Sequence, residues 1–121
     1  MNRFNIITLG VKNINKSLRF YKALGFKTAT HEDETPAIVF FNTEGTKLAL
    51  YEQTDLLNDT TLDSFASEGF KGITLAFNAK AKDTVDQLLN KAKILGGKVI
   101  KEASNTDWGG YSGYFLDLDG H

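Results

Sequence analysis

The sequence contains no cysteine, which excludes thiol catalysis, cysteine-ligated zinc and any disulfide framework. Charge of either sign is not in excess, because fourteen lysines and arginines face fifteen aspartates and glutamates. The chain therefore has no basic field that would hold a nucleic acid. It also lacks an apolar N-terminal targeting segment and any run near the ~20 apolar residues of a membrane span. These absences predict a cytoplasmic protein that binds neither nucleic acids nor membranes.

What the chain does have is a duplicated pattern. Its 121 residues, 41% of them hydrophobic, are enough to bury one core. The run Ile7-Thr8-Leu9 recurs as Ile73-Thr74-Leu75, and each copy precedes a helical pattern that ends in Leu-Gly. The apolar stripes of the two predicted helices are Ile14, Leu18, Tyr21 and Leu24 in the first and Val85, Leu88, Leu89, Ala92 and Leu95 in the second. A glycine after the last periodic residue is typical of a helix C-terminus.

The order of the predicted elements gives an α+β fold. After the first helix we expect strands at Phe26–His31, Ala37–Asn42 and Lys47–Glu52, with a hairpin turn at residues 43–45. The first module is then β-α-β-β-β over residues 1–52. Residues 53–71 form a connector that holds a short helix or acts as a lid. The second module, residues 72–121, repeats the pattern through Tyr111–Asp117 but lacks its last strand. All 121 residues form one domain in this interpretation.

Alternation along the strands separates a face covered by the helices from an open face. The covered sets are Ile7, Leu9 and Val11, then Leu48 and Leu50, then Ile73, Leu75 and Phe77. The open sets are Ile6, Thr8 and Gly10, then Ala49 and Tyr51, then Thr74, Ala76 and Asn78, and we class them as small or hydroxylated. Two sheets with such open faces either curve into a cleft for a small molecule or pack on each other as a polar-edged core. The alternation leaves both interpretations open.

A glycine-rich aromatic segment runs from Trp108 to Tyr114. It holds the only tryptophan, three glycines and two tyrosines, so its backbone can approach a ligand and its rings offer broad apolar faces. One interpretation is a binding loop for a flat or apolar molecule. The other is a β-bulge and corner whose rings fill the core between the modules.

Three stretches resemble the vicinal oxygen chelate superfamily, which groups glyoxalase I, bleomycin-resistance proteins and extradiol dioxygenases. The opening Ile6-Ile7-Thr8-Leu9-Gly10-Val11, with Ser17-Leu18-Arg19-Phe20-Tyr21 and Leu24-Gly25-Phe26, resembles the superfamily's first module. The end, Asp117-Leu118-Asp119-Gly120, resembles its closing turn. The Trp-Gly-Gly-Tyr segment points to a glyoxalase-like branch. The resemblance covers the whole chain and implies two β-α-β-β-β modules.

The resemblance also implies which positions would bind a metal. Enzymes of the superfamily hold a divalent ion with His, Gln or Glu on the first, fourth, fifth and eighth strands. The matching positions here are Ile6, Ala49 and Thr74, and the fourth lies beyond His121. Isoleucine and alanine have no lone pair, and a single threonine hydroxyl is a poor ligand. We therefore predict no metal and no cofactor, and we interpret His31 as a surface residue of an acidic loop.

Two functions remain at this point. The first is a metal-free protein that binds an apolar or aromatic small molecule. Its predicted ligand-binding residues are Thr8, Tyr51, Thr74, Asn78, Trp108 and Tyr111. The second is a glyoxalase-like lyase or isomerase, or a dioxygenase-related enzyme, with a divalent metal. Its metal ligands would then be residues other than the positions matched above. No residue is singled out as catalytic, and bound metal discriminates between the two.

Because the second module lacks its last strand, we predict a homodimer. Without it, a neighbouring strand keeps an unpaired row of backbone groups that invites another chain. Either residues beyond His121 supply the strand, or a partner subunit covers the edge.

Overall fold

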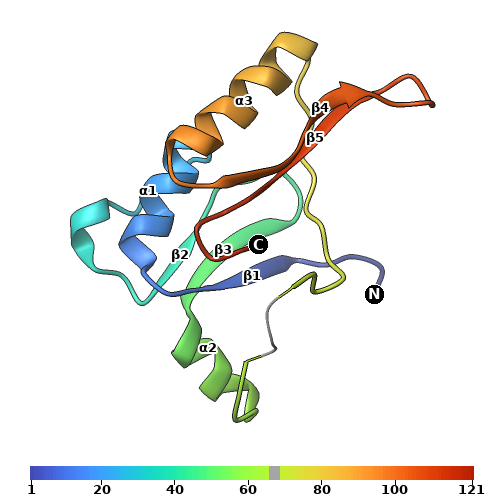
Figure 1. The fold of residues 1–121 in the computed structure, drawn as a ribbon. Coiled ribbons are helices and arrows are strands. Elements are labelled where there is room, and N and C mark those ends of the chain that lie inside the picture. Colours follow the sequence, from blue (N-terminus) through green and yellow to red (C-terminus); the bar gives the residue numbers. More distant parts are fainter. Residues whose placement is uncertain (66–68) are drawn as a thin grey trace. The chain divides into compact units, whose positions relative to one another are not determined.

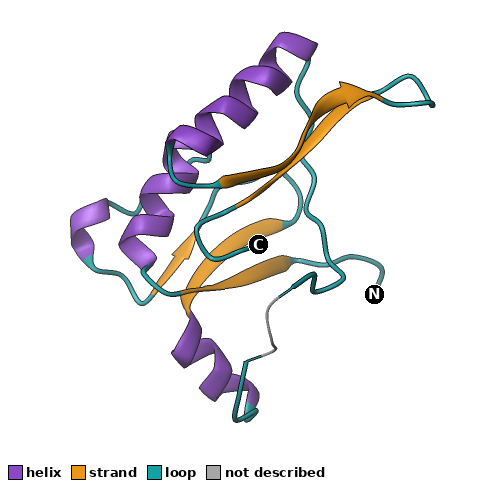
Figure 2. Cartoon of the chain, viewed as in Figure 1, coloured by secondary structure: helices purple, strands orange, loops and turns teal. Residues whose placement is uncertain are grey.

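The computed structural model describes residues 1–65 and 69–121 and has a mixed α+β fold (Figure 1; Figure 2), which confirms the fold class. The chain divides into two compact units, Met1–Glu68 and Gly69–His121. In the first unit the elements are β1 (Ile6–Val11), α1 (Ile14–Leu24), a 3-10 turn (Glu32–Glu34), β2 (Ile38–Phe40), β3 (Lys47–Glu52) and α2 (Gln53–Thr60). In the second unit they are α3 (Lys82–Ile94), β4 (Lys98–Asn105) and β5 (Tyr111–Leu116). No helix among the described residues has the length and apolar character needed to cross a membrane.

The first unit is built on a three-stranded sheet in the order β1-β3-β2. β1 runs parallel to β3, with Thr8 opposite Ala49 and Leu9 opposite Leu50, and β2 runs antiparallel to β3. The first strand, the strand at Lys47–Glu52 and the hairpin between β2 and β3 are therefore confirmed. The connector holds a helix, α2, which was one of its two expected forms.

The strand expected at Phe26–His31 is wrong, because these residues belong to no strand. A backbone hydrogen bond ties the segment to the chain beyond β2, from Asn42 N to Lys27 O at 2.7 Å. The next contact is made by a side chain instead, because the Thr28 hydroxyl donates to Phe40 O at 2.7 Å. One backbone bond and one hydroxyl bond do not make a ladder, and the chain turns at Glu32–Glu34 immediately afterwards.

Capping residues at both ends set the limits of helix α1. The Asn13 side chain accepts a hydrogen bond from Lys16 N at 2.9 Å, and Gly25 ends the helix with a φ of 114°. The helix packs against β2 and β3. The largest fully buried side chains of this unit are Phe20, Phe41, Leu18, Leu50, Val11 and Val39. Each such burial contributes roughly 1.5–3 kcal/mol, so this core holds α1 on one face of the sheet.

The second unit packs α3 on the antiparallel pair β4 and β5 (Figure 1). The contact is close at Gly113, where an added Cβ would lie 2.7 Å from Leu89 Cδ1. The predicted helix stop is confirmed, because Gly96 has a φ of 102°. The closing turn is stabilised by the Asp117 carboxylate, which accepts hydrogen bonds from Asp119 N and His121 N at 2.9 Å each.

The strand expected over residues 73–78 is also wrong, because the structure assigns these residues to no strand. The side chains expected to be covered are exposed instead, with Ile73 at 73% and Leu75 at 46%. The physical reason is that residues 73–78 have no neighbouring strand to pair with. The equivalent strand of the first unit, β1, pairs with β3, whereas in the described part of the second unit β4 and β5 pair only with each other.

Candidate functional site

The open face of the first unit's sheet is the first candidate site. Cross-strand partners share a face, so Thr8, Ala49 and Phe40 form one row across β1, β3 and β2. Gly10, Tyr51 and Ile38 form the next row. The opposite face carries Leu9, Leu50 and Val39, which are buried with α1. The predicted covered face is therefore confirmed for Leu9, Val11, Leu48 and Leu50, whereas Ile7, which was also expected to be covered, is 36% exposed near the start of β1.

Apolar side chains flank two hydroxyl groups on this face. Ile6, Ile38 and Phe40 are exposed, with Phe40 at 47%, while Tyr51 is half-buried and Thr8 is exposed. An alternating apolar and hydroxylated face of this kind offers both contact area and orienting hydrogen bonds to a small molecule.

Ala49 lies in the row that was expected to be open, but the structure buries it completely. Its methyl group stands between Thr8 and Phe40 on the two neighbouring strands. A methyl group is shorter than either neighbour, so the row is covered at its centre and exposed at its ends.

Helix α2 bounds one end of the open face. It begins directly after β3, where the Glu52 carboxylate accepts hydrogen bonds from Thr54 N at 3.0 Å and Asp55 N at 3.1 Å. It approaches the open face at Gly10, where an added Cβ would lie 3.3 Å from Leu56 Cδ2 and 3.4 Å from Gln53 Cβ. The absence of a side chain at Gly10 therefore lets α2 approach the end of β1.

Sequence reasoning missed three residues at this face, which are Ile38, Phe40 and Leu56. The run Ile38-Val39-Phe40-Phe41 is apolar throughout, so alternation could not show which side chains face the helix. The available signal was the register of the β2–β3 hairpin, since the turn at residues 43–45 sets which positions stand opposite each other.

In the second unit, Trp108 lies in the turn between β4 and β5. Its side chain is 79% exposed, and its ring lies over Gly110, where a Cβ would collide with the ring carbons. The ring therefore fills no core within this unit. Within this unit the ring is available to a ligand, and the alternative that it fills a core between the modules stays a prediction.

Tyr111 faces α3 and is held there by a polar cluster. Its hydroxyl donates a hydrogen bond to Asp86 Oδ1 at 2.7 Å, and Lys82 Nζ lies 5.4 Å from the centre of its ring. Lys82 Nζ also donates to Asn105 Oδ1 at 2.9 Å. The hydrogen bond to Asp86, with lesser effects of desolvation and of the charges of Asp86 and Asp83, raises the pKa of the Tyr111 phenol. Tyr111 is therefore a neutral donor that links β5 to α3.

The structure brings only some of the predicted ligand-binding residues together. Thr8 and Tyr51 share the open face of the first unit. Thr74 and Asn78 are exposed on the segment that forms no strand. Trp108 and Tyr111 belong to a different element of the same unit, the β4–β5 hairpin. The single cleft that the sequence predicts across both modules stays a prediction.

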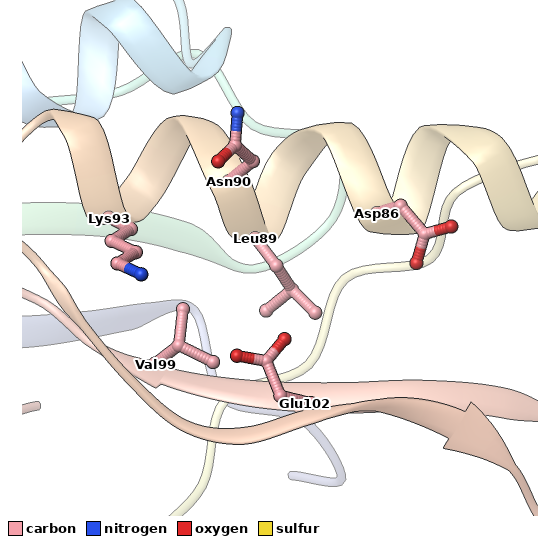
Figure 3. A pocket seen from close by; sticks show the side chains of 6 residues that line it. All are labelled: Asp86, Leu89, Asn90, Lys93, Val99 and Glu102. Carbon is pink, nitrogen blue, oxygen red and sulfur yellow. The ribbon is translucent and has the colours of Figure 1, made fainter.

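A pocket of about 250 Å³ lies between α3 and β4 (Figure 3). Its α3 residues follow the spacing of one helix face, and Leu89 points toward Val99 and Glu102 of β4 (Figure 3). The lining residues are Asp86, Leu89, Asn90, Lys93, Val99 and Glu102. Sequence reasoning missed this pocket because polar residues on a helix face are usually solvent-facing. The spacing of four pocket residues along α3 was the only signal.

The positions that the resemblance assigns to metal ligands do not fit a divalent ion. Ile6 is exposed on the open face and Ala49 is buried beside it, and neither side chain has a donor atom. Thr74 contributes a single hydroxyl in the other unit. Across residues 1–65 and 69–121, no three histidine, aspartate or glutamate side chains gather into a group that would hold a metal.

Comparison with known proteins gives a consistent result. The model of the Glyoxalase/Bleomycin resistance protein/Dioxygenase superfamily matches residues 3–121. The structure is similar to that of a hypothetical protein from S. aureus, with 31% sequence identity and a TM-score of 0.84 over 100% of this chain and 89% of that one. It is also similar to a glyoxalase-related enzyme from Fulvimarina pelagi, with 29% identity and a TM-score of 0.86 over 100% of this chain and 84% of that one.

A lactoylglutathione lyase from Agrobacterium tumefaciens shares the fold alone. It is 20% identical, with a TM-score of 0.66 over 100% of this chain and 90% of that one. A comparison with curated proteins found no match.

Proposed function

The chain belongs to the Glyoxalase/Bleomycin resistance protein/Dioxygenase superfamily, and we propose that within it the chain acts as a metal-free protein that binds an apolar or aromatic small molecule in the cytoplasm. The observation that carries this proposal is the open sheet face of the first unit. There the exposed Ile6, Ile38 and Phe40 flank the hydroxyl groups of Thr8 and Tyr51. Apolar surface left uncovered on a folded unit is a frequent mark of a binding surface.

The proposed ligand lies on this face. Its apolar part contacts Phe40 and Ile38, and one polar group exchanges hydrogen bonds with Thr8 and Tyr51. From the second unit, Thr74, Asn78, Trp108 and Tyr111 complete the proposed set, with the exposed Trp108 ring as a stacking surface. No side chain on the open face of the first unit, among the described residues, is a carboxylate, an imidazole or a thiol. Proton transfer by such a group is therefore not part of the proposal.

The experiment measures binding of a neutral aromatic probe, phenylnaphthylamine, by its fluorescence. Phe40→Ala removes exposed apolar contact area from the open face, and we expect it to weaken binding by about 1–2 kcal/mol, or roughly 5- to 30-fold. The matched control is Ile94→Ala, which truncates a side chain that is 75% exposed on α3, outside the proposed site. Equal affinities of the two variants would exclude this face as the site.

Metal analysis of the same preparation separates the proposal from the alternative enzyme. We expect metal well below one ion per chain and no isomerisation of a glutathione hemithioacetal, because Ile6, Ala49 and Thr74 offer no adequate ligand set. Stoichiometric zinc, nickel or iron that survives mild chelation would instead assign the protein to the metal-dependent lyases or isomerases of the superfamily.

The proposed functional unit is a homodimer. The support comes from the second unit, where Ile73 and Leu75 stay exposed because the described part of this unit has no strand to pair with residues 73–78. Exposed apolar side chains on an unpaired segment favour association with another chain.

A further inference from the structure

The pocket between α3 and β4 combines an apolar part with charges of both signs (Figure 3). Its apolar part is lined by Leu89, which is buried, and Val99, which is half-buried. Asp86 and Lys93 lie seven residues apart on α3, on either side of Leu89 (Figure 3). The rise of 1.5 Å per helical residue separates their backbone positions by about 10 Å along the axis. A carboxylate and an ammonium group therefore belong to opposite ends of the pocket.

A β-bulge in β4 turns a second carboxylate, that of Glu102, toward α3. Val99 stands opposite Phe115 and Lys101 stands opposite Tyr114, so β4 advances by two residues where β5 advances by one. Because cross-strand partners share a face and neighbours along a strand alternate, Glu102 returns to the face of Val99. In a regular strand, two residues three positions apart would point to opposite faces. Here both point toward α3 (Figure 3), and bulges that redirect a side chain are frequent next to functional sites.

The polar groups of this pocket are available to a ligand. Among the described residues, the side chains of Asn90, Lys93 and Glu102 take part in no hydrogen bond and no ion pair. Asp86 accepts the Tyr111 hydroxyl through Oδ1, which leaves Oδ2 as an acceptor. The opposite charges of Lys93 and Glu102 thus line one pocket without pairing with each other, and each can bind the opposite charge of a ligand.

We propose that this pocket binds a small zwitterion whose ammonium and carboxylate groups stand at opposite ends of a short apolar chain, as in an ω-amino acid. The ligand's ammonium group donates to the carboxylates of Asp86 and Glu102, and its carboxylate accepts from Lys93. Its methylene chain covers Leu89 and Val99. The volume of about 250 Å³ lies below the ~300–1,000 Å³ of pockets for drug-sized molecules, so the chain is short.

This site goes beyond the proposed function. All of its lining residues belong to the second unit, and none of them belongs to the proposed site for an apolar or aromatic molecule.

The test is a titration of the full chain with 6-aminohexanoate, followed by the NMR shifts of the backbone amides. We expect saturable shifts concentrated in α3 and β4. Hexanoate and hexylamine each lack one charged end and should bind at least ~10-fold more weakly. Hexane-1,6-diamine should also bind more weakly, because it places an ammonium group beside Lys93. Equal affinity for any of these three compounds, or shifts centred on the first unit, would overturn the proposal.

Single substitutions assign the two ends of the ligand. Lys93→Met removes the ammonium group but keeps an apolar stem, so it should weaken 6-aminohexanoate roughly 10-fold and leave hexylamine unchanged. Lys91→Met is the matched control, because Lys91 is exposed on the same helix outside the pocket. Glu102→Gln should weaken 6-aminohexanoate and hexylamine alike. Equal affinities of Lys93→Met and Lys91→Met for 6-aminohexanoate would exclude the assigned carboxylate end.

A charge reversal controls for misfolding of the variants. Lys93→Glu gives the pocket a third carboxylate and should bind hexane-1,6-diamine more tightly than the wild-type chain does, a gain that an unfolded variant cannot show. A Lys93→Glu variant without this gain would overturn the proposal. Phenylnaphthylamine binding should be the same in wild type and in all these variants, so failure of the zwitterion site would leave the proposed function standing.

Discussion

At the scale of single residues, the aromatic positions of the second unit differ in what surrounds them. Trp108 and Tyr111 lie three residues apart, but the tryptophan ring is exposed over Gly110 whereas the tyrosine hydroxyl is bound to Asp86 on α3. The sequence places both in one binding loop. The structure gives them separate surroundings, so we expect different effects when each residue is substituted.

Trp108→Ala tests the tryptophan as a ligand contact. Because the side chain is 79% exposed, its loss should change the free energy of unfolding by less than about 0.5 kcal/mol. If the ring stacks on the ligand, phenylnaphthylamine binding should weaken by roughly 1–3 kcal/mol. Denaturant titration and probe fluorescence measure the two quantities. A variant with a large loss in the free energy of unfolding and an unchanged affinity for the probe would show that Trp108 is structural.

Tyr111→Phe tests the bond to Asp86 through its pH dependence. The pKa of Tyr111 is raised from its ordinary value of 10.0 because its hydroxyl donates to Asp86, so the folded state favours the neutral phenol. The contribution to stability should therefore be fully present below pH 10.0 and should be lost as the pH rises through the higher pKa of the folded state.

Denaturant unfolding of wild type and Tyr111→Phe at neutral and alkaline pH measures this difference. The two curves should converge as the pH rises, whereas a gap that stays constant across the range would contradict the role of the hydroxyl bond. Tyr114→Phe is the matched control, because Tyr114 is exposed on the same strand.

At the scale of elements, the two halves of the repeat differ in their ladders. In the first unit, β3 pairs with both β1 and β2, and a helix can then cover one face of the three strands. In the second unit, α3 packs on a two-stranded ladder whose register shifts between Val99 and Lys101 and again between Lys101 and Ser104. α3 approaches this ladder closely at Gly113.

Gly113→Ala tests this contact. An added methyl group would lie 2.7 Å from Leu89 Cδ1 and 2.8 Å from Lys101 O, so either α3 or β4 must move. We expect a loss of about 1–3 kcal/mol in the free energy of unfolding. Ser112→Ala, at the neighbouring position on the other face of β5, should cost clearly less. Equal losses measured by denaturant unfolding would show that α3 does not pack closely on β5.

At the scale of the whole molecule, the proposed ligand binding rests on the apolar sheet face around Thr8 and Tyr51, which the first unit leaves open. The superfamily's fold explains why such a face exists, because a sheet covered by helices on one face keeps its other face for a ligand or another strand.

The sequence by itself determined α1, α3 and most strands, and it left α2 as one of two possible forms of the connector. Periodicity places the apolar stripe of α1, and glycine at positions 25 and 96 ends two helices, because these are local effects of backbone geometry. Alternation along β1 and β3 separates the covered from the open face for the same reason, so Thr8 and Tyr51 were found together.

Only the tertiary structure decided which strand-like segments pair and which side chains stay exposed. Residues 26–31 and 73–78 both read as strands, but a strand forms only when a neighbour supplies its hydrogen bonds, and that neighbour is distant in sequence. The same reason governs Ala49, Trp108 and Tyr111. Their burial, exposure and hydrogen bonding depend on Phe40, Gly110 and Asp86, whose positions no local pattern predicts.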